Sequence, residues 1–272
     1  MMRSLWTGAS GMIAQQTNVD TIANNLSNVN TSGYKSEKTE FKSLLYQTLQ
    51  TKTTSANGEE KPISAQVGLG TRVASNTSIF TQGSLIANES KSAFAIEGNG
   101  LFPVRGADGE TYYTRNGNFS WVKDGNVVSL CTQEGYHVLD SNGNVISLPA
   151  NVSSESVEFQ SNSGEIGYKD GAGNYHALNR RIGIYQFRNP AGLEKESNSL
   201  LSVTEASGDA MSEYTNNNLT RSKIVQGYLE GSNVQLADEM VNLIVAQRAY
   251  EMNSKVITTS DDMLGIANQL KR

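Results

Sequence analysis

Near the N-terminus, apolar residues recur in alternating steps of four and three. The series includes Leu5, Met12, Val19 and Leu26 and covers three heptads. This spacing is typical of a coiled-coil seam, and it predicts a helix from Ser4 to about Val29. Polar residues follow, and then Gly33, a residue without Cβ that can adopt positive φ and end a helix.

The C-terminal segment shows the same alternation over a longer stretch. Its regular positions are Ala249, Met252, Val256, Thr259, Met263, Ile266 and Leu270. Upstream, the segment around Met240 and Ile244 is apolar on more than one side, as if it had two neighbours. A capping-box pattern, Ser232-x-x-Gln235, predicts the start of this helix. The two helices would be roughly 37 and 55 Å long, which favours a rod over a compact enzyme.

The middle of the chain changes to a period of two, from about Phe94 to Val203. Short β-type runs alternate there with dipeptides that favour hairpin turns. These dipeptides are Asp108-Gly109, Asn116-Gly117, Asp124-Gly125 and Asn142-Gly143. The pattern predicts an antiparallel β region built from successive hairpins.

The predicted fold is therefore α+β, with long N- and C-terminal helices forming a coiled coil and a central antiparallel β-rich domain. We expect an N-terminal helix and turn over residues 1–45, which pairs with a C-terminal helix over 221–272. Residues 46–92 are polar and aperiodic, and we expect an extended connector with at most short strands. Residues 93–220 form the β-rich domain.

The terminal helices look too weak to stand alone. Gly8 and Gly11 each cost about 1 kcal/mol of helix stability relative to Ala. The apolar face from Leu236 to Ala246 is also wider than one partner helix covers. We therefore expect both ends to be flexible in the free chain and to fold when they pack against other copies.

Composition excludes several function classes. The chain has 22 Lys and Arg residues against 27 Asp and Glu, a net charge of −5, which does not favour nucleic-acid binding. The single cysteine, Cys131, excludes an internal disulfide and a cysteine-based zinc site. No apolar run is long enough to span a bilayer or to form a cleavable signal peptide. We expect no metal and no cofactor.

Catalytic motifs are incomplete. Ser32-x-x-Lys35 and Ser120-x-x-Lys123 match one element of penicillin-binding enzymes, but the other two elements are absent. Residues 140–144 begin like a calcium loop, yet the sixth and twelfth positions of that loop lack its glycine and glutamate. We interpret them as a hairpin turn. The sequence predicts no catalytic residue and no enzyme.

Several motifs resemble the bacterial flagellar rod and hook family. Residues 23–35, Ala-Asn-Asn-Leu-Ser-Asn-Val-Asn-Thr-Ser-Gly-Tyr-Lys, resemble its N-terminal signature, and residues 226–230, 232–234 and 247–255 resemble its C-terminal one. Residues 81–85, 94–102 and 113–119 are similar to the entry into its β domain. The signature positions are Asn24, Asn25, Leu26, Asn28, Gly33, Tyr34, Lys35, Gln247, Arg248, Ala249, Tyr250, Asn253 and Lys255.

The resemblance implies a structural subunit, most similar to the distal-rod members of the family, that polymerises into a hollow helical drive shaft. The shaft would transmit torque and form an export channel in the basal body, within the cell envelope. Implied partners are further copies, other rod proteins, the hook protein, the surrounding basal-body rings and the flagellar type III export apparatus, through which the chain would leave without a cleaved signal peptide. The implied assembly seam is Leu5, Met12, Val19, Leu26, Met240, Ile244, Ala249, Met252, Val256, Met263, Ile266 and Leu270.

Other interpretations stay open at this point. A proximal rod or hook subunit of the same family is one. A secreted β-domain binding protein, whose helices only form a stalk, is another. A third is an enzyme acting on peptidoglycan, which would lose turnover on Ser32→Ala or Ser120→Ala.

Overall fold

The structure is a computed structural model that describes residues 2–50, 65–125, 127–149, 152, 156–160, 164–169, 174–216 and 218–270. The chain divides into two compact units. The helical unit comprises residues 1–27, 37–78 and 235–272, and the β-rich unit comprises residues 28–36 and 79–234. Helices at both ends and strands between them confirm the α+β class.

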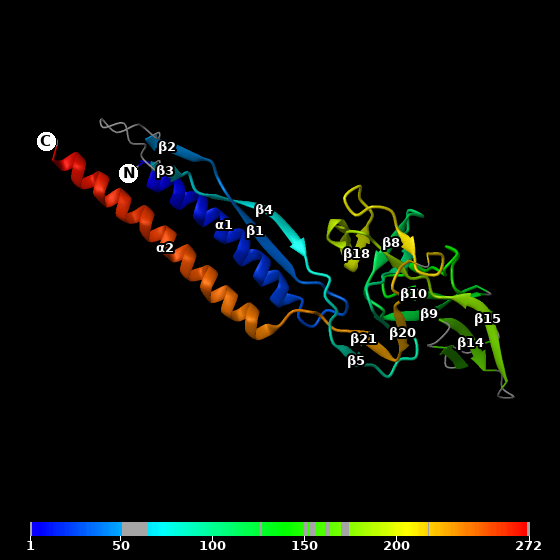
Figure 1. Cartoon of the computed structure of the whole chain (residues 1–272). Helices are drawn as coiled ribbons and strands as arrows, with labels where there is room; N and C mark the ends of the chain where they lie inside the picture. Colours follow the sequence, from blue (N-terminus) through cyan, green and yellow to red (C-terminus); the bar gives the residue numbers. More distant parts are fainter. Residues whose placement is uncertain are drawn as a thin grey trace. The chain divides into compact units, whose positions relative to one another are not determined.

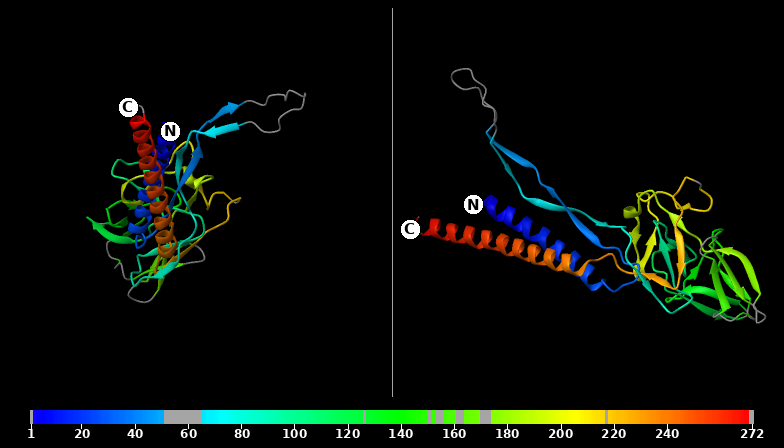
Figure 2. Two further views of the ribbon diagram at one scale, coloured as in Figure 1. Left: turned by 90° about the vertical axis from the view of Figure 1, so that its left-hand side faces the viewer. Right: turned by 60° about the horizontal axis from the view of Figure 1, so that its bottom comes forward.

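Two long helices lie side by side in the helical unit (Figures 1 and 2). They are α1 (Met2–Ser27) and α2 (Leu236–Gln269). The Ser4 and Ser260 hydroxyls are 3.0 Å apart, whereas Asn25 at the other end of α1 donates to Glu239 at 3.3 Å. Residue numbers therefore rise along α1 as they fall along α2, so the helices are antiparallel.

Small residues allow the two helices to approach closely. A Cβ added to Gly8 would lie 3.0 Å from Ile257, and one added to Gly11 would lie 2.8 Å from the Asn253 amide nitrogen. These glycines lower helix propensity, but their lack of a side chain leaves room for α2. The sequence pattern showed only the first of these two effects.

The start of α2 differs from the prediction. The helix begins at Leu236, and Gln235, at the N-cap position, makes no side-chain capping bond. The Ser232 hydroxyl accepts from the Val234 amide at 3.3 Å, outside the helix. The predicted capping box is therefore wrong. Residues 221–272 are also not all helical, because strands β20 (Lys223–Gln226) and β21 (Tyr228–Glu230) precede the helix.

A two-stranded ribbon completes the helical unit. Strand β1 (Glu37–Ser43) pairs antiparallel with β4 (Thr71–Ser78), and β2 (Tyr46–Gln50) pairs with β3 (Ala65–Gly68). The hydroxyl of Thr39 on β1 donates to that of Thr21 on α1 at 3.0 Å. The segment predicted as a connector with at most short strands thus carries an eight-residue strand, β4. Residues 51–64 lie outside the described part of the chain.

The β-rich unit is built from antiparallel pairs. Its largest described sheet has eight strands, in the order β12-β10-β11-β7-β8-β18-β17, with β9 on the other side of β10. A second sheet has the order β13-β14-β15, and the pairs β20–β6, β21–β5 and β16–β19 stand separately. The strand bounds are β5 Leu85–Ala87, β6 Phe94–Glu97, β7 Phe102–Arg105, β8 Thr111–Thr114, β9 Phe119–Asp124, β10 Val127–Thr132, β11 His137–Val138, β12 Ser147–Pro149, β13 Val157–Gln160, β14 Glu165–Lys169, β15 Tyr175–Arg181, β16 Tyr185–Gln186, β17 Glu194–Lys195, β18 Leu200–Ser202 and β19 Met211–Ser212.

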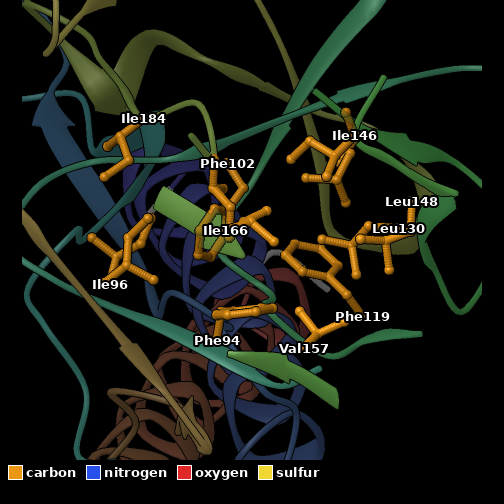
Figure 3. Packing of buried hydrophobic residues seen from close by; sticks show 14 of the residues in the cluster. Phe94, Ile96, Phe102, Phe119, Leu130, Ile146, Leu148, Val157, Ile166 and Ile184 are labelled. Atoms are coloured by element: carbon orange, nitrogen blue, oxygen red, sulfur yellow. The ribbon is translucent and has the colours of Figure 1, made fainter. Parts of the chain in front are cut away.

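An apolar core joins these strands (Figure 3). The Phe102 and Phe119 rings meet edge to face with centroids 5.2 Å apart, and Phe94 meets Phe159 in the same way at 5.4 Å. Aliphatic residues from other strands, such as Leu130 and Ile166, fill the space around the rings. The β-rich unit therefore buries its own continuous core, as an independently stable unit requires.

Three of the four predicted turns are hairpin turns. Gly109, Gly125 and Gly143 all have positive φ. In the last of these turns, the Asp140 carboxylate accepts hydrogen bonds from the backbone amides on either side of Gly143, those of Asn142 and Asn144. The prediction for Asn116-Gly117 is wrong, because β8 pairs with β7 and β18 rather than with β9. A Cβ on Gly117 would collide with the Phe94 carbonyl oxygen, so this glycine serves a close approach between backbones.

Candidate assembly and anchoring sites

The predicted seam on α2 is mostly exposed. Among the described residues of α2 only Ala246 and Ser260 are buried, and α1 is contacted through positions such as Asn253 and Ile257. At about 100° per residue, Met252 and its heptad partners lie roughly a quarter turn away from that contact face. Exposed fractions run from 46% to 84% along Met252, Val256, Met263, Ile266 and Leu270.

A second apolar group lies on the other flank of α2, near the start of the helix. Met240 and Ile244 are 51% and 56% exposed, and Leu236 is similarly open. The two flanks together match the sequence observation that this helix is apolar on more than one side. Of the remaining seam residues, Ala249 and the four on α1 (Leu5, Met12, Val19 and Leu26) are half-buried. Their role between copies stays a prediction.

Sequence reasoning found only part of an exposed apolar group on α1. Met2, Trp6 and Ile13 are each about two-thirds exposed or more. Trp6 and Ile13 are seven residues apart, so they fall on the same side of the helix. The sequence pattern includes Ile13 only as a widening of the stripe through Leu5 and Met12, and it gives no role to Met2 and Trp6.

Asn25 shows what one signature residue does. Its side chain donates to the Glu37 carbonyl oxygen at 2.8 Å and accepts from the Glu37 amide at 2.9 Å. It also reaches Glu239 at the start of α2, and burial raises the pKa of that carboxyl above its usual value. Asn25 thus holds the end of α1 to the ribbon and to α2.

A buried ion network joins three distant parts of the β-rich unit. Glu230 on β21 is 1% exposed, and its carboxylate accepts from Lys35 at 2.6 Å, from the Gly83 amide at 2.9 Å and from Arg115. The Lys35 ammonium also donates to the Thr81 carbonyl oxygen at 2.7 Å. Burial lowers the pKa of Lys35, and its pairing with Glu230 opposes this shift.

The remaining polar groups of this network are hydrogen-bonded to backbone atoms. The Arg115 guanidinium donates to the carbonyl oxygens of Ile96, Gly98 and Gly100. Gly33 has φ +71°, its amide donates to the Glu230 carbonyl oxygen at 2.8 Å, and a Cβ there would lie 2.7 Å from the Arg115 backbone. Gly33 is therefore required both by its dihedral angle and by the space available.

The rest of the signature is divided between packing and surface positions. Asn253 faces Gly11, and Asn28 closes the turn after α1 by accepting from the Thr31 amide and hydroxyl. Tyr34 lies 5.1 Å below the Lys195 ammonium. The exposed positions are Asn24, Gln247, Arg248, Tyr250 and Lys255. Within the described residues, no group of three His, Cys, Asp or Glu side chains could hold a metal ion, and no helix is long and apolar enough to cross a membrane.

Comparison with known proteins decides the family. Residues 5–35 match the model of flagella basal body rod proteins, residues 95–168 the flagellar hook protein FlgE/F/G D1 domain, and residues 225–270 the C-terminal model of flagellar basal body rod FlgEFG proteins. The chain is 44% identical to the flagellar basal-body rod protein FlgG of Borreliella burgdorferi, over the whole of both chains. The chain belongs to the flagellar basal-body rod protein family.

Further relatives agree. The FlgG protein of Agrobacterium fabrum is 41% identical over 98% of this chain and 99% of its own, and that of Bacillus subtilis is 36% identical over the whole of both. The flagellar hook-basal body complex protein FlhP of Bacillus subtilis is 31% identical over the same extent. This rod protein family is a structural one rather than a family of enzymes.

The buried ion network connects the three matched regions of this rod protein. Lys35 is the last residue of the N-terminal match, Arg115 lies in the middle match, and Glu230 lies in the C-terminal one. The three motifs that carried the sequence resemblance are therefore in contact at one carboxylate. Nothing in the spacing of these residues along the chain indicates this.

Proposed function

We propose that the chain is a structural subunit of the distal rod of the flagellar basal body. It polymerises through its terminal helices into a hollow helical shaft, which transmits torque and serves as an export channel. It acts without a cofactor and without catalysis. Its partners are further copies, other rod proteins, the hook protein and the surrounding rings. It reaches the basal body through the flagellar type III export apparatus, with no cleaved signal peptide.

The observation that carries this proposal is the apolar surface left open on both flanks of α2. Burying a side chain such as Ile or Met that is already half covered contributes about 1 kcal/mol. Some ten such residues on α2 would contribute on the order of 10 kcal/mol, which is comparable to the entropic cost of associating two proteins. Several neighbours per subunit are then needed for net stability, as in a helical polymer with many contacts.

The terminal coiled coil belongs to the same proposal. The intrachain contact between α1 and α2 uses small and polar positions such as Gly8, Gly11 and Ser260. The heptad-spaced apolar residues stay available on the flanks. In the shaft, these residues pack against the helices of neighbouring copies, so that the coiled-coil seam lies between subunits rather than within one.

A charge in the seam tests the proposal. Met252→Asp and Val256→Asp place a carboxylate where the neighbour would pack, at a cost of several kcal/mol if it is unpaired. Either variant, as the sole copy in the cell, should abolish motility and rod assembly. Thr258→Asp adds the same charge at an exposed position on another side of α2 and should swim normally. Normal swimming of both seam variants would refute the seam.

A second experiment addresses the stalked binding protein. A chain without residues 1–30 and 236–272 should fail to polymerise if the helices build the shaft. A binding protein would keep its activity after this truncation.

The match to FlhP favours one further candidate, another hook or basal-body component of the same family. Immunogold labelling of isolated basal bodies distinguishes a distal-rod subunit from such a component, because it shows whether the protein lies between the proximal rod and the hook.

A further inference from the structure

Asn233 lies where the chain passes between the two units. The boundary between the units is crossed four times, at residues 27/28, 36/37, 78/79 and 234/235. On the side of the β-rich unit, Ser36, Ile79 and Asn233 belong to three of these four crossing segments. The side chain of Asn233 is hydrogen-bonded to both of the others.

The hydrogen bonds use both the acceptor and the donor end of the amide. Its oxygen accepts from the Ser36 amide at 2.7 Å. Its nitrogen donates to the Ile79 carbonyl oxygen at 2.8 Å and to the Thr81 hydroxyl at 3.0 Å. The Ile79 amide in turn donates to the Ser36 carbonyl oxygen at 2.8 Å. One side chain thus connects three segments that are distant in sequence.

Only a side chain with a donor and an acceptor can make this arrangement. Aspartate would keep an acceptor for the Ser36 amide. Its second oxygen would replace the donor to the Ile79 carbonyl oxygen, and the two oxygens would repel each other. Alanine would remove all of the side-chain bonds and keep only the backbone bond from the amide of residue 233 to the Tyr34 carbonyl oxygen, at 3.4 Å. The nearby Glu230 network reaches the same three segments through Lys35, Thr81 and Gly83, but it makes no side-chain bond to Ser36 or Ile79, the residues next to the crossings.

We propose that Asn233 is a positioning residue that ties three of the four crossing segments together, so that they carry force as a bundle. The β1–β4 ladder already pairs two of these segments, at Glu37 and Ser78, and Asn233 adds the segment that leads into α2, so that the three share a force instead of being pulled away one after another. The tie is a property of the folded chain. Its mechanical role rests on the proposed function, since only a subunit of a torque-transmitting shaft carries such a load.

Hydrogen exchange of the full-length chain tests the tie itself. In Asn233→Ala the Ile79 amide should exchange about tenfold faster, although its own acceptor on Ser36 is untouched. Core amides such as Leu130 should keep their protection. In Asn233→Asp the Ile79 amide should also exchange faster, whereas the Ser36 amide should exchange more slowly than it does in Asn233→Ala. The matched control is Asn189→Ala. It removes a hydrogen bond from the Asn189 side chain to the Ala206 carbonyl oxygen in the same unit, and it should leave the exchange rates of the Ser36 and Ile79 amides unchanged.

Two results would overturn the tie. One is an Ile79 amide that stays protected in Asn233→Ala. The other is faster exchange throughout the β-rich core, which would mean that Asn233 only stabilises the unit in general. Because exchange is measured on the free chain, the answer does not depend on whether the protein polymerises.

Swimming under load tests the mechanical role. Cells with Asn233→Ala should assemble rods and swim in dilute medium, but should lose motility at a lower viscosity than cells with Asn189→Ala. Equal loss in both strains would refute force sharing while leaving the tie intact. If the unaltered chain does not build rods at all, the proposed function fails, and the exchange result still decides the tie.

Discussion

Replacing Glu230 by Gln should cost the β-rich unit about 3–5 kcal/mol of unfolding free energy. The variant keeps the size and one acceptor oxygen, but it removes the single negative charge between Lys35 and Arg115. Two buried cations are then left without a counterion, and breaking a buried ion pair in this way is far more costly than removing an exposed one. Most of the cost is the desolvation of the charges that stay behind.

The assay is urea unfolding followed by the fluorescence of Trp121, which packs against the core of this unit. Trp6→Phe in every variant removes the signal of the other tryptophan, on α1. The control is Glu158→Gln, whose partner Lys169 is 2.5 Å away and about half exposed, so that it should cost at most about 1 kcal/mol. Adding 0.5 M salt should reduce the loss of unfolding free energy in Glu158→Gln and leave the loss in Glu230→Gln nearly unchanged. Equal costs for Glu230→Gln and Glu158→Gln would refute the anchoring role of this network.

Two further predictions concern the helical unit. Gly265→Ala, with open space around it, should raise helix stability by about 0.5–1 kcal/mol, seen as a higher melting temperature of the helix signal in circular dichroism. Gly11→Ala should gain less, because the new Cβ would lie 2.8 Å from the Asn253 side-chain amide, which must move aside; an equal gain in both would contradict the close approach. The raised pKa of Glu239 means that the folded helix pair binds a proton more tightly than the unfolded chain. Its stability should therefore increase as pH falls through this pKa toward 4.5, the ordinary pKa of a glutamate, and Glu239→Gln should flatten that part of the melting profile.

The parts of the fold that follow from neighbouring residues could be predicted from the sequence. Heptad spacing located α1 to within about two residues at each end and located the body of α2, although the predicted range of 221–272 began before the helix, in strands β20 and β21. Asp-Gly pairs located hairpins because a two-residue turn needs positive φ at those positions. Asn116-Gly117 has the same composition, but Gly117 is a glycine because the Phe94 carbonyl oxygen approaches it. A dipeptide does not distinguish a turn from a close approach.

Pairings across long stretches of chain could not be predicted. The ribbon β1–β4 joins residues 28 to 41 positions apart, from Ser43 with Thr71 to Glu37 with Ser78, in polar segments without regular alternation. The Glu230 network depends on three charges that are each unremarkable in sequence and become informative only when they are buried together. For the same reason Lys35 looked like part of a catalytic motif, whereas its ammonium is held in an ion pair.

Small residues between α1 and α2 lead to a last prediction about the free chain. Helix α1 buries Gly8, Ala14, Thr21, Ile22 and Asn25, whereas α2 buries only Ala246 and Ser260 among its described residues, so α2 gains little apolar burial within the chain. In proteins most helical stability comes from the tertiary packing of an apolar face rather than from helix propensity. In a dilute monomer, amides of α2 should therefore exchange orders of magnitude faster than those of the β-rich core, and they should become protected on polymerisation. Equal protection of α2 and the core strands in the monomer would mean that the helices are stable without neighbours, and the apolar flanks would no longer be needed to explain how they fold.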